Sequence, residues 1–213
     1  MEITWLGHSC FRIKGKQATI LTDPFPPQTG YSLGKPIADI VSVSHEHPNH
    51  CYVQGISGNT KVISGPGEYE INGVIIQGIQ TYHDTEHGAI RGKNTAFLFE
   101  VDDITVCHLG DLGHTLNAEQ SAKLNPVDIL IVPAGGGTTI DAAQAAHLVR
   151  ALEPKIVIPM HYKTDLFTQT LAPLDGFLKE MAVKEAVPQP KLIVNKNALP
   201  PLMQVMVLSY HQS

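Results

Sequence analysis

The chain has 213 residues, of which 43% are hydrophobic and 16% are charged, and its formal net charge is −5. This composition is typical of a globular protein and excludes a largely disordered chain. The 15 lysines and arginines are scattered along the sequence, which argues against general nucleic-acid binding because phosphate backbones require clustered cations. Every apolar run is shorter than the roughly 20 residues that a membrane helix needs, so we expect no membrane partner.

The start of the sequence and its cysteines bear on its compartment. The first residues show no basic segment followed by a long apolar run, so we expect no signal peptide. Three cysteines do not make a disulfide framework, which indicates a reducing environment. We therefore expect a cytoplasmic protein. Its length suits a single domain over residues 1–213, because no linker or low-complexity segment divides the chain.

Short segments rich in Val, Ile, Thr and aromatic residues alternate with glycine and proline turns, which predicts many short strands. The expected strands are Ile3–Leu6, Cys10–Ile13, Ala18–Thr22, Ile40–Ser44, Lys61–Ser64, Val74–Tyr82, Ala96–Val101, Ile104–His108, Ile129–Pro133, Ile156–Pro159 and Leu202–Leu208. The expected helices are Asn117–Leu124, Asp141–Leu152 and Pro173–Met181, of which the second has Asp141 as its N-cap. Ser64–Glu70 is a turn by composition, either a hairpin connection or a loop that lines the site. This order favours sheets covered by helices.

Five of the predicted strands end on a carboxylate or an imidazole. These residues are Asp23, His45, His83, Asp111 and His161. Ligand sites in layered α/β folds form where such strand ends meet at one edge. We therefore expect the five side chains to converge on one crevice.

The densest group of histidines is His45, His47 and His50. An extended backbone places His45 and His47 on the same face, and Pro48 then breaks the strand so that the turn can bring His50 to the same point. A lone histidine is more often structural than functional. Three within six residues after a buried strand favour a metal site, since imidazole is the commonest metal ligand.

Residues His45–His50 read His-Glu-His-Pro-Asn-His and resemble the His-x-His-x-Asp-His signature of the metallo-β-lactamase superfamily. His83, Asp111 and His161 follow in the family's order. The segment Thr4–Phe11 is similar to a short branch that includes L-ascorbate 6-phosphate lactonase-like proteins. The resemblance implies an α/β fold of the four-layer αββα sandwich type. It also implies a hydrolase that cleaves an ester-type bond, a lactone or a phosphoester, through a metal-activated water.

The resemblance further implies two metal ions that share this water. The implied ligands are His45, His47 and His83 for the first ion, His50 and His161 for the second, and Asp111 for both. Zinc is the expected metal, with manganese and iron as alternatives. Three imidazoles and an open position lower the pKa of a zinc-bound water towards about 7.

Asn49 departs from the family signature, which has aspartate at this position and uses it both as a ligand and to orient the water. A neutral amide can ligate only through its oxygen and is no useful base. We therefore expect one tightly bound ion and a weakly bound second ion. The alternative function is a weakly active or non-catalytic member that binds a metal or a small ligand. Asn49 could also serve as a helix N-cap.

Beside Asn49, two histidines are candidates for catalytic work. His8 follows the first strand and either touches the substrate, supports a ligand or only makes a turn. His114 lies in the loop after the bridging aspartate and either protonates a leaving group or is an ordinary loop residue. Asp23 is expected to orient a ligand histidine, and His108 is expected to be buried support.

The implied partner is a small molecule, and an anionic one would need local positive charge. Arg91 and Lys93 could supply it, although solvated loop cations are common. The backbone of Gly135–Gly137 could cradle an anion or make a tight strand–helix turn. Tyr162 and Lys163 are weaker candidates for substrate contact. Homo-oligomerisation stays open.

Overall fold

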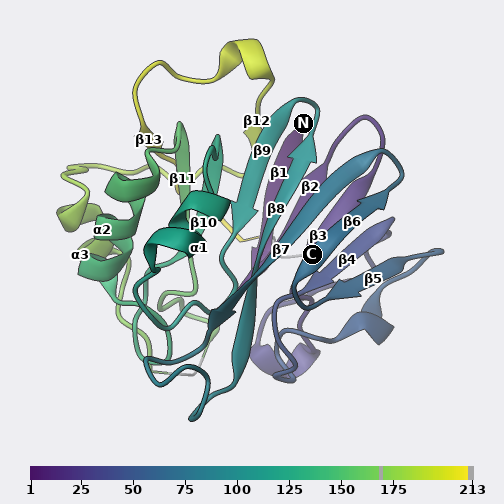
Figure 1. The fold of residues 1–213 in the computed structure, drawn as a ribbon, viewed down its shortest axis with the longest axis horizontal. Coiled ribbons are helices and arrows are strands. Elements are labelled where there is room, and N and C mark those ends of the chain that lie inside the picture. The colour runs from purple at the N-terminus through teal and green to yellow at the C-terminus, as the bar shows by residue number, and fades with distance from the viewer. Residues whose placement is uncertain (168–169, 211–213) are drawn as a thin grey trace.

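The computed structural model describes residues 1–167 and 170–210. Two sheets lie face to face, and the helices lie on the outer side of the second sheet (Figure 1). The first sheet has the order β12 (Leu192–Ile193), β1 (Glu2–Gly7), β2 (Cys10–Lys14), β3 (Thr19–Thr22), β4 (Ile40–Val43), β5 (Lys61–Ser64). The second has the order β13 (Gln204–Val205), β11 (Ile156–Met160), β10 (Ile129–Pro133), β9 (Ile104–His108), β8 (Lys93–Val101), β7 (Val74–Tyr82), β6 (Gly67–Ile71).

The main core fills the space between the two sheets. Trp5 and Phe11 from the first sheet and Phe97 and Phe99 from the second are at most 1% exposed. Because side chains alternate along a strand, the remaining apolar residues face the outer sides of the sheets. Burial at roughly 25 cal/mol per Å² of apolar surface makes these layers the main source of stability.

Helices α1 (Ala118–Lys123), α2 (Ala142–Leu152) and α3 (Asp175–Glu180) belong to the outer layer of the second sheet. The predicted cap of α2 is confirmed, since the Asp141 side chain accepts a hydrogen bond from Gln144 N at 2.8 Å. Loops containing Phe25 and Tyr31 cover the outer side of the first sheet. In the described residues, this fourth layer contains 3-10 helices at Pro27–Thr29 and Val53–Gly55 and no α-helix.

Three sequence predictions about elements need correction. Most of the predicted turn Ser64–Glu70 is strand, because Ser64 ends β5 and Gly67–Glu70 lie in β6, which pairs with the long edge of β7. Residues 64–66 nevertheless line a cavity, as the second interpretation of this segment expects. In Leu202–Leu208, the strand is confined to Gln204–Val205, the two residues that pair with β11. No helix begins at Asn49 in the described residues, because residues 48–50 form a turn. Within the described residues, no helix is long and apolar enough to cross a membrane.

The strand directions bring the predicted polar ends together. β3 and β4 are parallel in the first sheet. In the second sheet β9, β10 and β11 are parallel, and β7 runs the same way because β8 is antiparallel to both β7 and β9. The carboxyl ends of strands from both sheets therefore meet at one edge of the sandwich.

Candidate metal centre

Asp111 lies at the centre of a group of histidines. Its Oδ2 is 3.2 Å from His83 Nε2, 3.3 Å from His50 Nε2, 3.4 Å from His161 Nε2 and 3.9 Å from His45 Nε2. All five residues are buried, and none is more than 7% exposed. The predicted convergence of the strand ends is thus confirmed for His45, His83, Asp111 and His161, and His50 joins them from the turn after β4.

His47 completes a set of three imidazoles. Its ring centroid is 4.6 Å from that of His45 and 5.1 Å from that of His83. One ligand atom from each of these three residues lies within 4.8 Å of the other two. We call His45, His47, His50, His83, Asp111 and His161 the His/Asp cluster.

The cluster contains several buried polar atoms that have no hydrogen-bond partner among the residues that the structure describes. They are His45 Nε2, His50 Nε2, His83 Nδ1, Asp111 Oδ1 and His161 Nδ1. An unsatisfied buried polar atom costs free energy, so such a group requires an explanation. Imidazole nitrogens and a carboxylate are the ligands of zinc and similar transition metals. The residues present therefore fit a metal ion.

Asp23 positions histidines of the cluster in the way that the sequence predicted. Asp23 Oδ2 accepts a hydrogen bond from His50 Nδ1 at 3.0 Å and one from Ser44 Oγ at 2.5 Å. Because Ser44 Oγ donates its hydroxyl hydrogen to the bond with Asp23, it acts as the acceptor in its hydrogen bond with His45 Nδ1 at 2.9 Å. Both imidazoles are thereby held with Nδ1 as the donor and Nε2 turned towards Asp111, where a metal ion would replace the proton that His50 carries on Nε2.

Burial and the neighbouring charges shift the pKa values of several residues in the cluster. Burial raises the pKa of Asp111, but the neighbouring His161 and His50 outweigh it and hold the pKa well below its ordinary value. Burial lowers the pKa of His50, but the carboxylates of Asp111 and Asp23 outweigh it and raise that pKa to about 10. Burial and the nearby His50 lower the pKa of His45 to about 3. A charge pair of Asp111 and His50 thus lies at the middle of the cluster.

Asp111 is positioned by the backbone of Gly110, which lies directly against the side chains of Asn94 and Ser44. Gly110 adopts a φ of 56°, and a Cβ at this position would collide with Asn94 Oδ1 and lie 2.6 Å from Ser44 Cβ. Asn94 Oδ1 accepts from Asp111 N at 3.0 Å, and its Nδ2 donates to Leu109 O at 2.9 Å. The sequence predicted neither Asn94 nor Ser44, because no local motif marks them. Ser44 contacts Asp23, 21 positions away, and Asn94 contacts Leu109 and Asp111, 15 and 17 positions away.

The other predicted residues differ in how close they lie to the cluster. His8 is 2% exposed, and its Nε2 is 3.1 Å from Asn49 Nδ2, so the structure brings these two together. His108 is buried support, as predicted, and donates from Nε2 to Ser9 O at 2.9 Å. His114 accepts from the backbone N of Tyr82 and donates to the backbone O of Thr115. With both ring nitrogens bonded to backbone, His114 has no free nitrogen for proton transfer, and the contacts favour the alternative of an ordinary loop residue.

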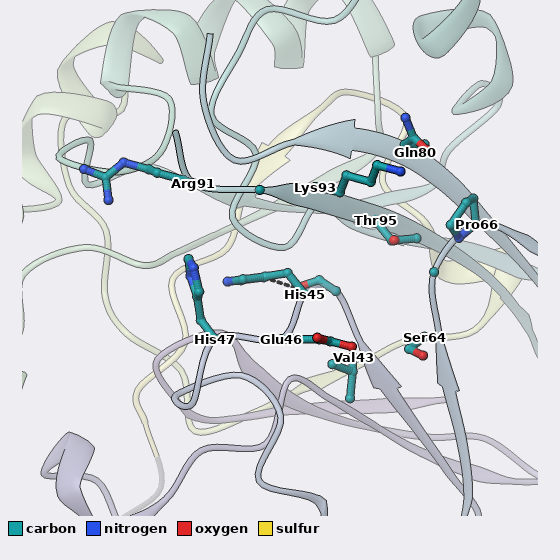
Figure 2. A pocket seen from close by; sticks show the side chains of 13 residues that line it. Val43, His45, Glu46, His47, Ser64, Pro66, Gln80, Arg91, Lys93 and Thr95 are labelled. Atoms are coloured by element: carbon teal, nitrogen blue, oxygen red, sulfur yellow. Dashed lines mark hydrogen bonds between the residues drawn. The ribbon is translucent and has the colours of Figure 1, made fainter. Parts of the chain in front are cut away.

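A cavity of about 470 Å³ opens beside the cluster. Figure 2 shows Lys93 on one side of it and His45, Glu46 and His47 on the other. Arg91 also belongs to the lining, at the end beside His47. The cavity therefore connects the predicted cations with two of the predicted metal ligands.

Three weaker candidates do not line this cavity. Gly135 lies against the backbone of the late histidine: a Cβ there would collide with His161 O and lie 2.7 Å from Tyr162 Cα. This contact explains the glycine as a tight turn. Tyr162 is 8% exposed and packs on Trp5, with ring centroids 5.3 Å apart. Lys163 bonds through its backbone N to Ala172 O.

One carboxylate organises the loop between β7 and β8. Asp84 accepts backbone hydrogen bonds from Glu86 N and Gly88 N at 2.8 Å each, from Ile90 N at 3.0 Å and from Arg91 N at 2.6 Å. Burial raises the pKa of Asp84, but these four donors outweigh it and lower the pKa to about 2. Asp84 thereby fixes the loop that carries Arg91 to the cavity.

We expect Asp84→Ala to speed up amide hydrogen exchange in residues 86–91 by about 10-fold or more, because four N–H groups lose their acceptor. Exchange in β10 should stay unchanged. In the wild-type chain the folded pKa lies below the unfolded value, so this stabilisation is complete above a pH of about 4. It is lost as the pH falls towards about 2. Unchanged exchange in the variant would show that the carboxylate does not hold the loop.

The comparisons with known proteins agree with this geometry. Residues 2–161 match the family model described as a Beta-lactamase superfamily domain. A UPF0173 metal-dependent hydrolase of Pyrococcus horikoshii is 29% identical, and the match covers 77% of this chain and 85% of that protein. A UPF0173 protein of Pyrococcus abyssi is 32% identical over 77% of this chain and 84% of its own length.

Solved structures show the same fold. A Thermotoga maritima protein, assigned to the Zn-dependent hydrolases of the metallo-β-lactamase superfamily, is 38% identical with a TM-score of 0.83, and the match covers 99% of both chains. An isothiocyanate hydrolase from Delia radicum gut bacteria shares the fold at 14% identity and a TM-score of 0.71, over 92% of this chain and 99% of that one. The chain therefore belongs to the metallo-β-lactamase superfamily, and relatives of it are named metal-dependent hydrolases.

Proposed function

We propose that this protein is a zinc-dependent hydrolase that cleaves an ester-type bond, a lactone or a phosphoester, in a small anionic substrate. The observation that carries the proposal is the buried Asp111 carboxylate among four imidazoles, beside a cavity lined by cations. The proposed metal ligands are His45, His47 and His83 for the first ion, His50 and His161 for the second, and Asp111 for both. A bound divalent ion supplies a Lewis acid and acidifies a water at neutral pH.

The chain's own residues prepare the site for this chemistry. Ser44 and Asp23 fix the protonation of two histidines so that their Nε2 atoms face Asp111. The turn held by Asn94 places the Asp111 carboxylate at the same point. Such fixed ligands lose little freedom when they bind an ion. Asn49, being neutral, does not accept a proton here.

Positive charge at the cavity supports an anionic substrate. Arg91 and Lys93 are exposed on its lining, and neither takes part in an ion pair among the described residues. Glu46 supplies one opposing charge from the other side. Lys93 lies at the start of β8 and borders the cavity, where its ammonium can reach a substrate anion. The Coulomb attraction there is modest because water screens it.

We test the proposal with chromogenic phosphodiesters, anionic and neutral lactones, and thioesters, using protein loaded with zinc or manganese. We expect metal-dependent turnover of at least one anionic ester. In Lys93→Gln, KM for that ester should rise by about 3- to 5-fold with kcat nearly unchanged, because an exposed binding contact is lost and no reacting group is touched. Lys179→Gln, on α3, is the matched control and should behave as the wild type.

Two results would contradict parts of this proposal. If a neutral ester suffers the same rise in KM in Lys93→Gln, the lysine does not recognise an anion. If fully metal-loaded protein turns over none of these esters, the weakly active or non-catalytic alternative is the better description. From the resemblance of the segment Thr4–Phe11 to lactonase-like proteins, we expect an anionic lactone to be among the best substrates of the panel.

A further inference from the structure

The turn between β1 and β2 holds His8 in an unusual backbone conformation. Its φ of 53° lies in the left-handed region that residues other than glycine adopt infrequently. Trp5 Nε1 donates to His8 O at 2.9 Å. Thr22 Oγ1 and His108 Nε2 both donate to Ser9 O, at 3.0 and 2.9 Å. Three buried side chains thus fix the turn, as is typical where backbone strain serves a site.

The His8 ring lies among the histidines of the cluster, and it does not line the cavity. Its centroid is 4.6 Å from that of His50 and 5.0 Å from that of His161. Phe167 covers it, with ring centroids 4.6 Å apart. Because His8 is only 2% exposed, direct contact with a substrate in the cavity does not explain its position.

Asn49 is the neighbour that makes the position of His8 informative. One ring nitrogen of His8 is 3.1 Å from the Asn49 amide, and the other, Nδ1, is buried and has no hydrogen-bond partner within residues 1–167 and 170–210. One ligand atom from each of His8, His50 and His161 lies within 4.8 Å of the other two. An imidazole therefore lies against the side chain that stands where the family signature has its carboxylate.

We propose that His8 takes over the ligand role of that missing carboxylate, so that His8, His50, His161 and Asp111 hold the second ion. This inference rests on the proposed function, because it takes the first site as given. A set of three imidazoles and one carboxylate is complete for a four-coordinate transition metal. The second site was expected to be weak because its only imidazole ligands were His50 and His161. His8 adds a third imidazole.

Replacing a carboxylate by an imidazole also changes the charge of the site. Asp111 is then the one ligating carboxylate, and a pair of bound dications keeps one more unit of positive charge than with an aspartate at position 49. This favours anionic substrates over neutral ones. Imidazole-rich sites also select zinc, cobalt or iron over magnesium, whose preferred ligands are oxygens.

The test measures metal binding and does not depend on turnover. Metal-free protein is titrated with Co²⁺, and bound cobalt is followed by absorption and by metal analysis after gel filtration. We use His8→Asn because asparagine tolerates a positive φ. The wild type should bind two equivalents, and His8→Asn should keep the first unchanged while its affinity for the second falls by about 10-fold or more. The double variant His8→Asn with Asn49→Asp should regain the second equivalent.

His147→Asn is the matched control, since His147 is exposed on α2, and it should bind cobalt as the wild type does. Unchanged binding of two equivalents by His8→Asn would overturn the proposal, and so would one equivalent in both that variant and the wild type. A double variant that holds only one equivalent would also count against the replacement. A wild-type chain that binds no cobalt would overturn the proposed function itself. If His8→Asn does not fold, His8→Gln is measured in its place.

Discussion

Replacing Asp111 by asparagine is expected to lower kcat/KM for an anionic ester by at least about 1000-fold, equivalent to roughly 4 kcal/mol of transition-state stabilisation. The Asp111 carboxylate oxygen lies within 3.9 Å of four imidazole nitrogens, and no other residue of the cluster offers a negative charge. Asparagine has nearly the same shape but no charge, so the loss would report electrostatics and ligation rather than packing. Steady-state kinetics with zinc-loaded protein measure the effect.

Metal analysis of the same variant separates two causes of the loss. If Asp111 bridges two ions, Asp111→Asn should bind both ions more weakly, because each loses its shared carboxylate. Asp165→Asn removes an exposed carboxylate and serves as the control. A variant that keeps more than about a tenth of the activity together with full metal content would show that Asp111 is not a ligand.

The sequence predicted the two-sheet fold because its buried strands combine apolar runs with turn residues at their ends. It could not predict β6, because Gly67, Glu68 and Glu70 have low strand propensity. These residues form a strand because the nine-residue β7 offers them an edge, a tertiary effect that local composition does not carry. The helix caps of α1 and α2 were predictable because a capping box is local, with both partners three residues apart.

For the candidate site too, local features could be predicted from the sequence and contacts between distant residues could not. His45 and His47 could be predicted as neighbours because their spacing on an extended segment is fixed. The role of Ser44 could not, because it depends on Asp23, which lies 21 positions earlier and meets it through the pairing of β3 with β4. His8 was one of several candidates in the sequence. Only its burial beside Asn49 distinguishes it from a turn residue.

Asp23→Asn is expected to weaken metal binding and lower kcat/KM by about 10- to 100-fold. Asp23 accepts one hydrogen bond from His50 Nδ1 and another from the Ser44 hydroxyl. The Ser44 oxygen in turn accepts a hydrogen bond from His45 Nδ1 and so orients that ring. The amide nitrogen of asparagine donates instead of accepting, so one of these contacts must break or reverse. Because Asp23 is fully buried, a lost contact is not replaced by water.

Two serines on the same segment allow the effect to be assigned. Ser44→Ala removes the hydrogen bond to His45 but leaves the one between Asp23 and His50. It should therefore weaken the binding of only one of the two cobalt equivalents. Asp23→Asn should weaken the binding of both. Ser42→Ala, two residues earlier on β4, removes a buried hydroxyl that has no hydrogen-bond partner in the described part of the chain, and it should change the affinity for neither equivalent. If Ser42→Ala and Ser44→Ala behave alike, the hydroxyl of Ser44 does not position His45. If Asp23→Asn lowers the affinity for only one cobalt equivalent, the Asp23 carboxylate supports a single metal site. Asp23 would then not link the two sites through His45 and His50.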